Sequence, residues 1–587
     1  MAELQRHWQP RELHQGIDES ELSWRIDRLM CAGFDPLTAR ILALRGHKNP
    51  QEAKAYLEPS LTHLPDPFAM RDMERAADRV AAAVLRGERV MVSGDYDCDG
   101  QGGTALLVEF LRDLGVEISY FLPVRDVDGY GLSERAIRDA AQEGVKVIIS
   151  VDCGTSNVHE ADVARQLGIS LIVTDHHQPP DVLPQAFALV NPHQKDCPFP
   201  GKELSGVGVA WYLAAAVRSI LRKRNYFANR PEPDLKKALD LVALSTVADL
   251  VPITGVNRVL VKHGLSVMEQ EGRLGLVELA KVAGVKRYSC GTIGFSLGPR
   301  LNAGGRLADS RVGVQLLMAD CAEKAQEIAL ELDALNHERQ QIEAQILDQC
   351  IERIEAGEQG HKSIVLAGEG WEAGVVGIVA SRLVERYHKP CVLIALDGNG
   401  QGKGSARSIK GFHLFEQLGR CADTLIKFGG HEYAAGLSIE EDRVADLARE
   451  LDALACTTLS DEDMVPRLYY DAEVGLGDLS VGVVERLSQM EPFGMGNPGP
   501  VFVVRGVSPR NARAVGTNHL SFLACDDATG AIKAIAFQQA EKLARLSGEV
   551  KVDLLFSPSI NEWQGQRSVQ LEIKDMRVSE QGGGALC

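Results

Sequence analysis

Apolar runs rich in β-branched residues alternate with segments of helical periodicity from about residue 76 onward. The apolar runs cover 89–93, 146–151 and 170–174, and the helical segments cover 105–114 and 134–143. Alternation of strand and helix is typical of a parallel sheet that carries helices on both faces. The pattern therefore predicts an α/β domain at 76–320.

The other regions have patterns of their own. Residues 1–75 indicate a cap of short helices separated by prolines. A polar helical stretch at 321–356 would extend about 50 Å at about 1.5 Å per residue. A glycine-rich block at 357–458 shows a second α/β pattern. At 464–580, short alternating strands and a hairpin signal at 561–565 predict a small β-barrel.

Composition and charge narrow the class of protein. Of 587 residues, 45% are apolar and 25% charged, which excludes a disordered or collagen-like chain. The net charge of −18 argues against a protein coated in positive charge, but it allows a local basic channel. The 12 cysteines are scattered without a CxxC pair, as in a reducing compartment. Because neither a membrane-spanning run nor a signal-peptide core is found, we expect a cytoplasmic protein without membrane contact.

Acidic side chains follow each of the three apolar runs. The first run is followed by Asp95, Asp97 and Asp99, the second by Asp152, and the third by the triplet Asp175-His176-His177. In open parallel sheets, ligands bind outside the carboxyl ends of the strands. We therefore expect these groups to converge on one crevice, together with a fourth acid that lies farther along the chain, Asp249.

Several carboxylates and imidazoles in one crevice need cations, because without them the charges repel and each carboxyl group resists ionisation. Oxygen ligands with one or two imidazoles suit Mn²⁺ or Mg²⁺. A carboxylate that bridges two such ions about 3.5–4 Å apart supports in-line attack on phosphorus. The residues thus indicate a metal-dependent phosphoryl chemistry.

Each motif also has a simpler interpretation. The spacing Asp95-x-Asp97-x-Asp99-Gly100 is that of an EF-hand loop, but that loop requires Glu at its twelfth position, where Leu106 stands, and a preceding helix. A single Asp at a strand end is usually a helix N-cap. A lone His pair is more often structural. The three motifs at successive strand ends together favour the metal site.

With these motifs in place, the chain resembles the DHH phosphoesterase superfamily. Within it, the chain is similar to the family of bacterial single-strand-specific 5′-to-3′ exonucleases, over nearly its whole length. Further landmarks of the resemblance lie at 126–132, 298–307, 335–339, 374–383, 404–408 and 429–436. The resemblance implies a parallel-sheet DHH domain, a long connecting helix, a smaller α/β DHHA1 domain and a C-terminal OB-fold.

The resemblance also implies the ligands of two Mn²⁺ or Mg²⁺ ions per active site, with Asp152 as the bridge. The implied ligands are Asp97, Asp99, Asp152, His176 and Asp249, with Asp95 as a further candidate. His177 would contact phosphate or support the ligands. Asp175 would orient the histidines by accepting their ring N–H groups.

The substrate contacts implied by the resemblance lie mostly in the second α/β block. Ser405 and Arg407 would bind the phosphate end of the strand, with Arg125 and Arg300 reaching in. His431 would contact the scissile phosphate, and Asn302 and Arg306 would line the strand path. Without the motif, Arg407 could equally be a surface ion pair, His431 a core histidine, and Arg300 and Arg306 solvated loop charges.

In the barrel, stacking aromatics and a basic groove would bind single strands. Trp563 and Phe522 are the main stacking candidates, beside Phe502, Phe537, Arg513 and Lys533. Alternating aromatics in a barrel are, however, more often core residues.

The chain departs from the pattern of its relatives at three places. Ser93 stands where related pyrophosphatases have His, which would weaken one metal or recruit Asp95. The glycines in Gln101-Gly102-Gly103 would loosen a helix start. Glu372 stands where relatives often have His.

We therefore predict a monomeric exonuclease that degrades single-stranded DNA to 5′-mononucleotides in recombination and in mismatch and base-excision repair. A helicase and a single-strand-binding protein would be its partners. Two alternatives stay open: a DHH/DHHA1 phosphodiesterase acting on short oligonucleotides, and a non-catalytic DHH scaffold.

Overall fold

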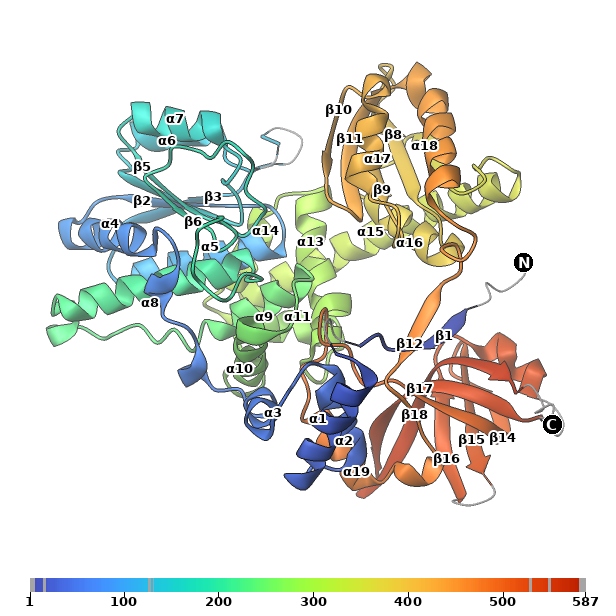
Figure 1. Cartoon of the computed structure of the whole chain (residues 1–587). Coiled ribbons are helices and arrows are strands. Elements are labelled where there is room, and N and C mark those ends of the chain that lie inside the picture. The colour runs from blue at the N-terminus through green and yellow to red at the C-terminus, as the bar shows by residue number, and fades with distance from the viewer. Residues whose placement is uncertain are drawn as a thin grey trace. The chain divides into compact units, whose positions relative to one another are not determined.

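The computed structural model describes residues 6–13, 17–124, 128–129, 131–526, 530–546 and 550–579, which form two compact units (Figure 1). Residues 61–466 belong to the first unit, together with 494–496. The second unit combines 6–60 with the C-terminal region. The N-terminal segment thus groups with the predicted barrel and not with the α/β block that follows it in sequence. The predicted domain boundaries stay predictions.

The first α/β block is built on a five-stranded parallel sheet of order β3-β2-β4-β5-β6. Its strands are β2 (Val90–Gly94), β3 (Ile118–Phe121), β4 (Val147–Val151), β5 (Ser170–Thr174) and β6 (Ala188–Val190). β2 has β3 on one side and β4 on the other, so the strand order reverses there. The carboxyl ends of β2 and β4 therefore border the crevice in which α/β sheets bind ligands.

Helices cover both faces of this sheet, as predicted (Figure 1). One face packs against α4 (Met73–Arg86), α5 (Cys98–Asp113) and α8 (Gly206–Lys223), and the other against α6 (Glu134–Gln142) and α7 (Val158–Gln166). Side chains alternate along the strands: Val90 and Val92 belong to the first core and Met91 to the second. Burial on both faces explains why these strands are continuous apolar runs.

A helical region follows the first sheet. It contains α9 (Leu239–Ala248), α10 (Gly255–Glu271), α11 (Leu274–Val282), α12 (Cys290–Thr292), a π-helix (Ile293–Leu297), α13 (Gly298–Leu307) and α14 (Arg311–Leu317). The predicted long helix is confirmed as α15 (Ala322–Glu355), which has 34 residues. No helix among the described residues combines the length and apolar character needed to cross a membrane.

The glycine-rich block forms a mixed five-stranded sheet of order β10-β11-β9-β8-β7. Its strands are β7 (Ile364–Glu369), β8 (Cys391–Leu396), β9 (Gln401–Arg407), β10 (Lys427–Gly430) and β11 (Ala434–Glu440). β7 and β8 are parallel, and the remaining pairs are antiparallel. The helices of this block are α16 (Val376–Tyr387), α17 (Leu414–Arg420) and α18 (Val444–Thr458).

The second unit contains the predicted barrel. Its strands are β14 (Phe502–Val515), β15 (His519–Asp526), β16 (Gly530–Ala536), β17 (Val552–Trp563) and β18 (Gln566–Val578), and the pairing of β14 with β17 closes the sheet. The expected hairpin is present: Gln564 and Gly565, both with positive φ, connect β17 to β18. β13 (Ala472–Glu473) adds to β14.

The same unit contains the N-terminal segment and a strand pair that the sequence analysis did not predict. β1 (His7–Pro10) pairs in parallel with β12 (Arg467–Tyr470). The helices α1 (Glu19–Cys31), α2 (Pro36–Leu44), α3 (Pro50–Leu57) and α19 (Val481–Ser488) complete the unit, and residues of the N-terminal helices share one apolar core with the barrel strands.

Candidate metal centre

The loop between β2 and α5 places three of the predicted ligands. Asp97 is the N-cap of α5, and its Oδ1 accepts the backbone N–H groups of Asp99 at 2.9 Å and Gly100 at 3.1 Å. Asp95 is 3% exposed and precedes the cap by two residues. Asp97 is thus a helix N-cap, and this role is compatible with metal binding through its second carboxylate oxygen.

Asp99 is held by the N-terminus of α8. Its Oδ2 accepts the N–H of Gly206 at 2.6 Å and its Oδ1 accepts the N–H of Val207 at 2.9 Å. The positive end of the helix dipole favours a carboxylate at this place. The sequence analysis missed Gly206 and Val207; the small-residue run behind Ser205, the N-cap of α8, is the signal that marks them.

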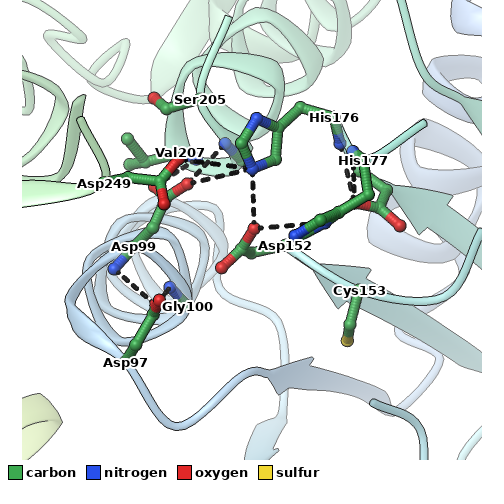
Figure 2. Close-up of polar contacts among 12 residues, drawn as sticks. Asp97, Asp99, Gly100, Asp152, Cys153, His176, His177, Ser205, Val207 and Asp249 are labelled. Carbon is green, nitrogen blue, oxygen red and sulfur yellow. Dashed lines mark hydrogen bonds and ion pairs between the residues drawn. The ribbon is translucent and has the colours of Figure 1, made fainter. Parts of the chain in front are cut away.

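Asp152 follows β4 in an unusual backbone conformation. Its φ is +61°, in the left-handed region that residues other than glycine seldom adopt. Asp152 is 2% exposed, so the surrounding core holds this strained conformation in place. The effect is that the carboxylate turns into the crevice at the end of the sheet, where Figure 2 shows it beside the two histidines.

The triplet after β5 is organised by Asp175. Its Oδ1 accepts the backbone N–H of His176 at 2.7 Å and lies 2.8 Å from Nδ1 of the His177 ring. Its Oδ2 accepts the N–H of Thr155 at 2.9 Å. Asp175 thus orients the ring of His177, as predicted, but it contacts His176 through the backbone and not through the ring.

Ring nitrogen Nε2 of His176 lies at the centre of the group (Figure 2). It is 3.0 Å from Asp152 Oδ1, 3.5 Å from Asp249 Oδ2 and 3.8 Å from Asp99 Oδ2. Asp249 reaches this point from the C-cap of α9. Four separated stretches of chain therefore meet at one place: three follow the ends of β2, β4 and β5, as predicted, and Asp249 joins them from the end of α9.

Burial and mutual repulsion change the pKa values of these acids. Burial and the charge of Asp97 raise the pKa of Asp99 to about 7, and burial and the charge of Asp99 raise the pKa values of Asp152 and Asp249 well above the ordinary range. Burial, and then the charge of His177, lower the pKa of His176 to about 4. Neutral imidazole is the form that binds metal.

In the Asp175–His177 pair the pKa values shift the other way: that of the carboxyl group is lowered and that of the imidazole is raised. Burial alone would raise the pKa of Asp175, but the hydrogen bonds from His177 and Thr155 outweigh it and hold that pKa well below the ordinary range. Burial would lower the pKa of His177, but the bond to Asp175 raises it to about 9.

The donor set fits a pair of divalent cations. Three groups have ligand atoms within 4.8 Å of one another: Asp152-His176-His177, Asp99-His176-Asp249 and Asp95-Asp97-Asp152. Asp152 and His176 are each shared by two groups. The buried Oδ1 of Asp95 accepts no hydrogen bond from any described residue. Carboxylate oxygens with one or two imidazoles suit Mn²⁺ and Mg²⁺, and cations remove the repulsion that raises the carboxyl pKa values.

The glycines at the start of α5 are explained by close packing. A Cβ on Gly102 would lie 2.1 Å from the Ser245 hydroxyl oxygen, and one on Gly103 would lie 2.3 Å from a methyl group of Val151. The helix is continuous from Cys98, so the expectation that these glycines loosen it is wrong. They let α5 approach its neighbours closely.

A pocket of about 500 Å³ lies beside the metal centre. It is lined by Tyr96 of the β2–α5 loop, by Arg306 of α13, and by Lys403, Ser405 and Arg407 of β9. Arg407 Nη1 donates to the Ser405 hydroxyl at 3.1 Å. The three β9 residues alternate along the strand and so share one face. This alternation marks Lys403, which the sequence analysis missed.

Helix α16 begins at the wall of this pocket. A Cβ on Gly377, in its first turn, would lie 2.7 Å from the Ser405 Oγ and 3.1 Å from Arg407 Nη2. The backbone N–H groups of a helix N-terminus bind phosphate. Glu372, one of the predicted departures, also lines the pocket.

The other predicted substrate residues have different surroundings. Arg300 forms an ion pair with Asp333 at 2.8 Å, and Asn302 Oδ1 accepts the N–H of Cys98 at 2.7 Å. His431 is exposed in the turn between β10 and β11. Arg125 lies outside the described residues. The contact between Asn302 and Cys98 supports the first turn of α5 and the preceding β2–α5 loop, which carries Asp95 and Asp97.

The barrel separates its aromatic residues into two sets. Phe522 is 2% exposed and Phe502 is fully buried, both in the barrel core, so assigning them to base stacking was wrong. Every second residue of these strands points into the closed barrel, and the rings of Phe502 and Phe522 are among these inward side chains. Trp563 at 70% and Phe537 at 51% are exposed, and Arg513 and Lys533 are exposed charges.

Comparisons with known proteins agree with this architecture. The "DHH family, N-terminal domain" matches 89–246, the "DHHA1 domain" matches 360–456, and the "RecJ OB domain" matches 470–575. The chain is 39% identical over 550 residues to the single-stranded-DNA-specific exonuclease RecJ of Bacillus subtilis, covering 93% of this chain and 68% of that one. It is also 39% identical to the RecJ of Dickeya dadantii, over 92% of this chain and 96% of that one.

Solved structures extend the similarity to the fold. The crystal structure of Thermus thermophilus RecJ in complex with Mn²⁺ matches with a TM-score of 0.82 and 30% identity, covering 99% of this chain and 81% of that one. The complex of the same protein with Mg²⁺ matches with a TM-score of 0.75 and 28% identity, covering 98% and 79%. The resemblance predicted from the motifs is thereby confirmed.

Proposed function

This chain belongs to the RecJ family, and from that premise we propose that it is a metal-dependent exonuclease that degrades single-stranded DNA from the 5′ end to 5′-mononucleotides. The observation that carries the proposal is the convergence of Asp99, Asp152, His176 and Asp249 at the carboxyl edge of the first sheet. Relatives named single-stranded-DNA-specific exonucleases support the substrate class.

The proposed ligands of two cations are Asp97, Asp99, Asp152, His176 and Asp249, with Asp95 as an added oxygen donor. Asp152 is the proposed bridge, because its carboxylate belongs to two of the ligand groups. When bound, the cations supply a water of lowered pKa and neutralise charge on the phosphoryl oxygens. Asp175 holds the ring of His177, and the first turn of α8 holds Asp99.

The position of the neighbouring pocket supports hydrolysis from the 5′ end. Ser405, Arg407 and the N-terminus of α16 bind the 5′-phosphate, with Arg306 beside them. Arg offers two parallel donors to a phosphate, and helix N–H groups add further ones. Tyr96 connects this pocket to the metal loop, so the phosphate that follows the terminal one lies at the metal centre. Each cycle then releases one nucleotide.

Arg125 and His431 remain proposed contacts of the strand, and Arg300 and Asn302 are proposed to line its path while they keep their contacts with Asp333 and Cys98. Selection of single strands is steric: helix α15 sets the distance between the two α/β blocks, and a duplex is too wide for the passage. The barrel binds the strand through exposed side chains such as Trp563. We further propose a monomer that receives its strand from a helicase and a single-strand-binding protein, in recombination and in mismatch and base-excision repair.

Digestion of 5′-labelled DNA with Mn²⁺ or Mg²⁺ tests the proposal. We expect labelled mononucleotide from a single strand, little product from a blunt duplex, and none with a chelator. Asp152→Ala should lower the rate at least about 1,000-fold, which corresponds to about 4 kcal/mol of lost stabilisation. Asp113→Asn, an exposed acid at the other end of α5, is the matched control.

The same assay separates the two alternatives. A short-oligonucleotide phosphodiesterase would cleave di- and trinucleotides but leave long strands intact. A scaffold would show no metal-dependent hydrolysis of any length. Mononucleotide release from the 3′ end, or equal rates with Asp152→Ala, would contradict the proposal directly.

A further inference from the structure

Phe295 is an aromatic side chain that the structure leaves almost entirely in solvent. It is 88% exposed and lies in the π-helix Ile293–Leu297 that precedes α13. π-Helical turns are rare and often occur at functional sites. Single exposed apolar residues are common and need no explanation, so the significance of Phe295 depends on its surroundings.

The π-helix packs against the end of α9 that carries Asp249. A Cβ on Gly294 would lie 4.0 Å from Val247 Cγ1, and one on Gly298 would lie 3.2 Å from the Cβ of Ala248. Asp249, the next residue, is one of the proposed metal ligands. Phe295 therefore belongs to a turn that directly borders the metal centre.

Two further exposed apolar side chains lie on segments that adjoin this turn. Leu250, directly after Asp249, is 66% exposed and has a φ of +59°. Met495 is 56% exposed, and its carbonyl accepts the N–H of Ile253 at 2.7 Å. A leucine held in the left-handed region without burying its side chain is unfavourable, and such strain is concentrated at functional sites.

The phosphate pocket, the start of α5 and the segment that ends in Asp249 are contacted by successive positions along helix α13. Its C-terminal end carries Arg306 at the phosphate pocket, where Arg306 Nη1 donates to the Gly374 carbonyl at 2.7 Å. Asn302 in its middle contacts Cys98, the first residue of α5. Its first residue, Gly298, packs against the segment that ends in Asp249. Phe295 precedes this helix, about 16 Å along the axis from Arg306 at about 1.5 Å per residue.

We propose that Phe295 is a stacking platform for a base of the substrate strand, on the 3′ side of the scissile phosphate. The inference rests on the proposed function, because a strand whose 5′-phosphate lies near Arg306 and which crosses the metal centre next reaches the Phe295 end of α13. About 16 Å spans a few nucleotides, given about 3.4 Å for each stacked nucleotide and more for a stretched one. The ring therefore serves the third or fourth nucleotide.

A nucleobase fits this position better than a phosphate does. The nearest arginine along the helix, Arg300, is committed to Asp333 and to the Ser296 carbonyl, which it contacts at 2.8 and 2.7 Å. Three exposed side chains on the segments around this turn, Leu250, Phe295 and Met495, are apolar. Every base has a flat face, so stacking here holds the strand without selecting a sequence.

Kinetics on 5′-phosphorylated oligonucleotides of increasing length test the role of Phe295. Phe295→Ala should raise KM for tetranucleotides and longer strands by roughly 5- to 100-fold, the usual range for loss of one stacked base, with kcat nearly unchanged. For a dinucleotide, KM should change less than about twofold, and Phe295→Trp should restore wild-type values. Phe415→Ala is the matched control: Phe415 is 42% exposed on α17 and has an aromatic neighbour, Phe428.

A spectroscopic measurement locates the stacked base. Strands carrying 2-aminopurine at single positions are bound to Asp152→Asn enzyme with or without Phe295→Ala. We expect quenching at the third or fourth nucleotide that disappears with Phe295→Ala. Unchanged kinetics and quenching, or an equal loss on dinucleotides and long strands, would overturn the inference. If the wild-type chain did not hydrolyse DNA, the proposed function would fail, whereas the quenching would still decide the role of Phe295.

Discussion

Gly206 lies directly against Asp152: a Cβ added to Gly206 would come within 2.6 Å of the Cβ of Asp152 and 2.9 Å of its Cα. The same glycine donates its N–H to Asp99 Oδ2 at 2.6 Å. One residue of α8 thus sets the positions of two proposed metal ligands. The contact joins the N-terminus of α8 to the strained residue after β4, and these two places are far apart in the sequence.

Gly206→Ala should therefore damage the metal centre. The added methyl group forces Asp152 or α8 to move, which we expect to weaken metal binding by about 10- to 100-fold, as loss of supporting contacts does. Calorimetric titration with Mn²⁺ measures this change. Gly208→Ala is the control, because the atom nearest to its Cβ would be the flexible end of Leu204, at 3.1 Å, and the Ser205 Oγ would follow at 3.4 Å. Equal Mn²⁺ affinity in Gly206→Ala and wild type would contradict this account.

Metal removal should destabilise the first unit. Without cations, the buried carboxylates of Asp95, Asp99, Asp152 and Asp249 repel one another. Burial and this repulsion both raise their pKa values. Mn²⁺ at about 100 times its Kd should stabilise the folded state by about 2.7 kcal/mol. Thermal melts with Mn²⁺ and with a chelator measure the shift. Asp152→Asn should lose most of it, and an undiminished shift would place the ions elsewhere.

Arg407→Ala should reduce the preference for a 5′-phosphorylated strand over a 5′-hydroxyl strand. A hydrogen bond to a charged group contributes about 1.5–3 kcal/mol, so kcat/KM for the phosphorylated strand should fall by roughly 10- to 100-fold, with a smaller effect on the hydroxyl strand. Arg420→Ala, an exposed arginine of α17, should leave the ratio of the two rates unchanged. A parallel fall for both substrates would argue against the phosphate contact.

In the barrel, Trp563→Ala should lower the affinity for single strands, whereas Phe522→Ala should lower the stability of the fold. Trp563 is exposed, so its loss should lower single-strand affinity by roughly 5- to 100-fold without changing the melting temperature. Phe522 is buried, so its loss should cost about 3–5 kcal/mol of stability. Fluorescence anisotropy with a labelled oligonucleotide and thermal melts make the two measurements. Normal affinity in Trp563→Ala would remove that residue from the strand path.

Local chemistry accounts for much of what could be predicted. Strands β2, β4 and β5 were expected within one residue of their bounds, because parallel strands buried on both faces are short continuous apolar runs. Asp152 and the Asp175 triplet were identified because strand ends mark the binding edge of such a sheet. The long helix α15 was likewise predictable from uninterrupted helical periodicity.

Other features depend on contacts between distant segments. Whether Phe522 faces the core or the solvent depends on how the barrel closes, because alternation alone assigns two faces without saying which is inside. Likewise, residues 6–60 group with the barrel through apolar packing across more than 400 positions of sequence. The glycines of α5 were misjudged because propensity describes the isolated helix and not the neighbours that require close approach.

The sequence by itself determined the fold class, the family and the identity of the acids and histidines, because strand runs, helix periods and motif spacing are written in neighbouring residues. Only the tertiary structure decided how those residues are held: the left-handed backbone of Asp152, the donation from α8 to Asp99, and the ring orientation of His177. The physical reason is that a metal site is defined by angles and distances of a few ångströms between separate elements, and these are set by packing, which no single segment contains.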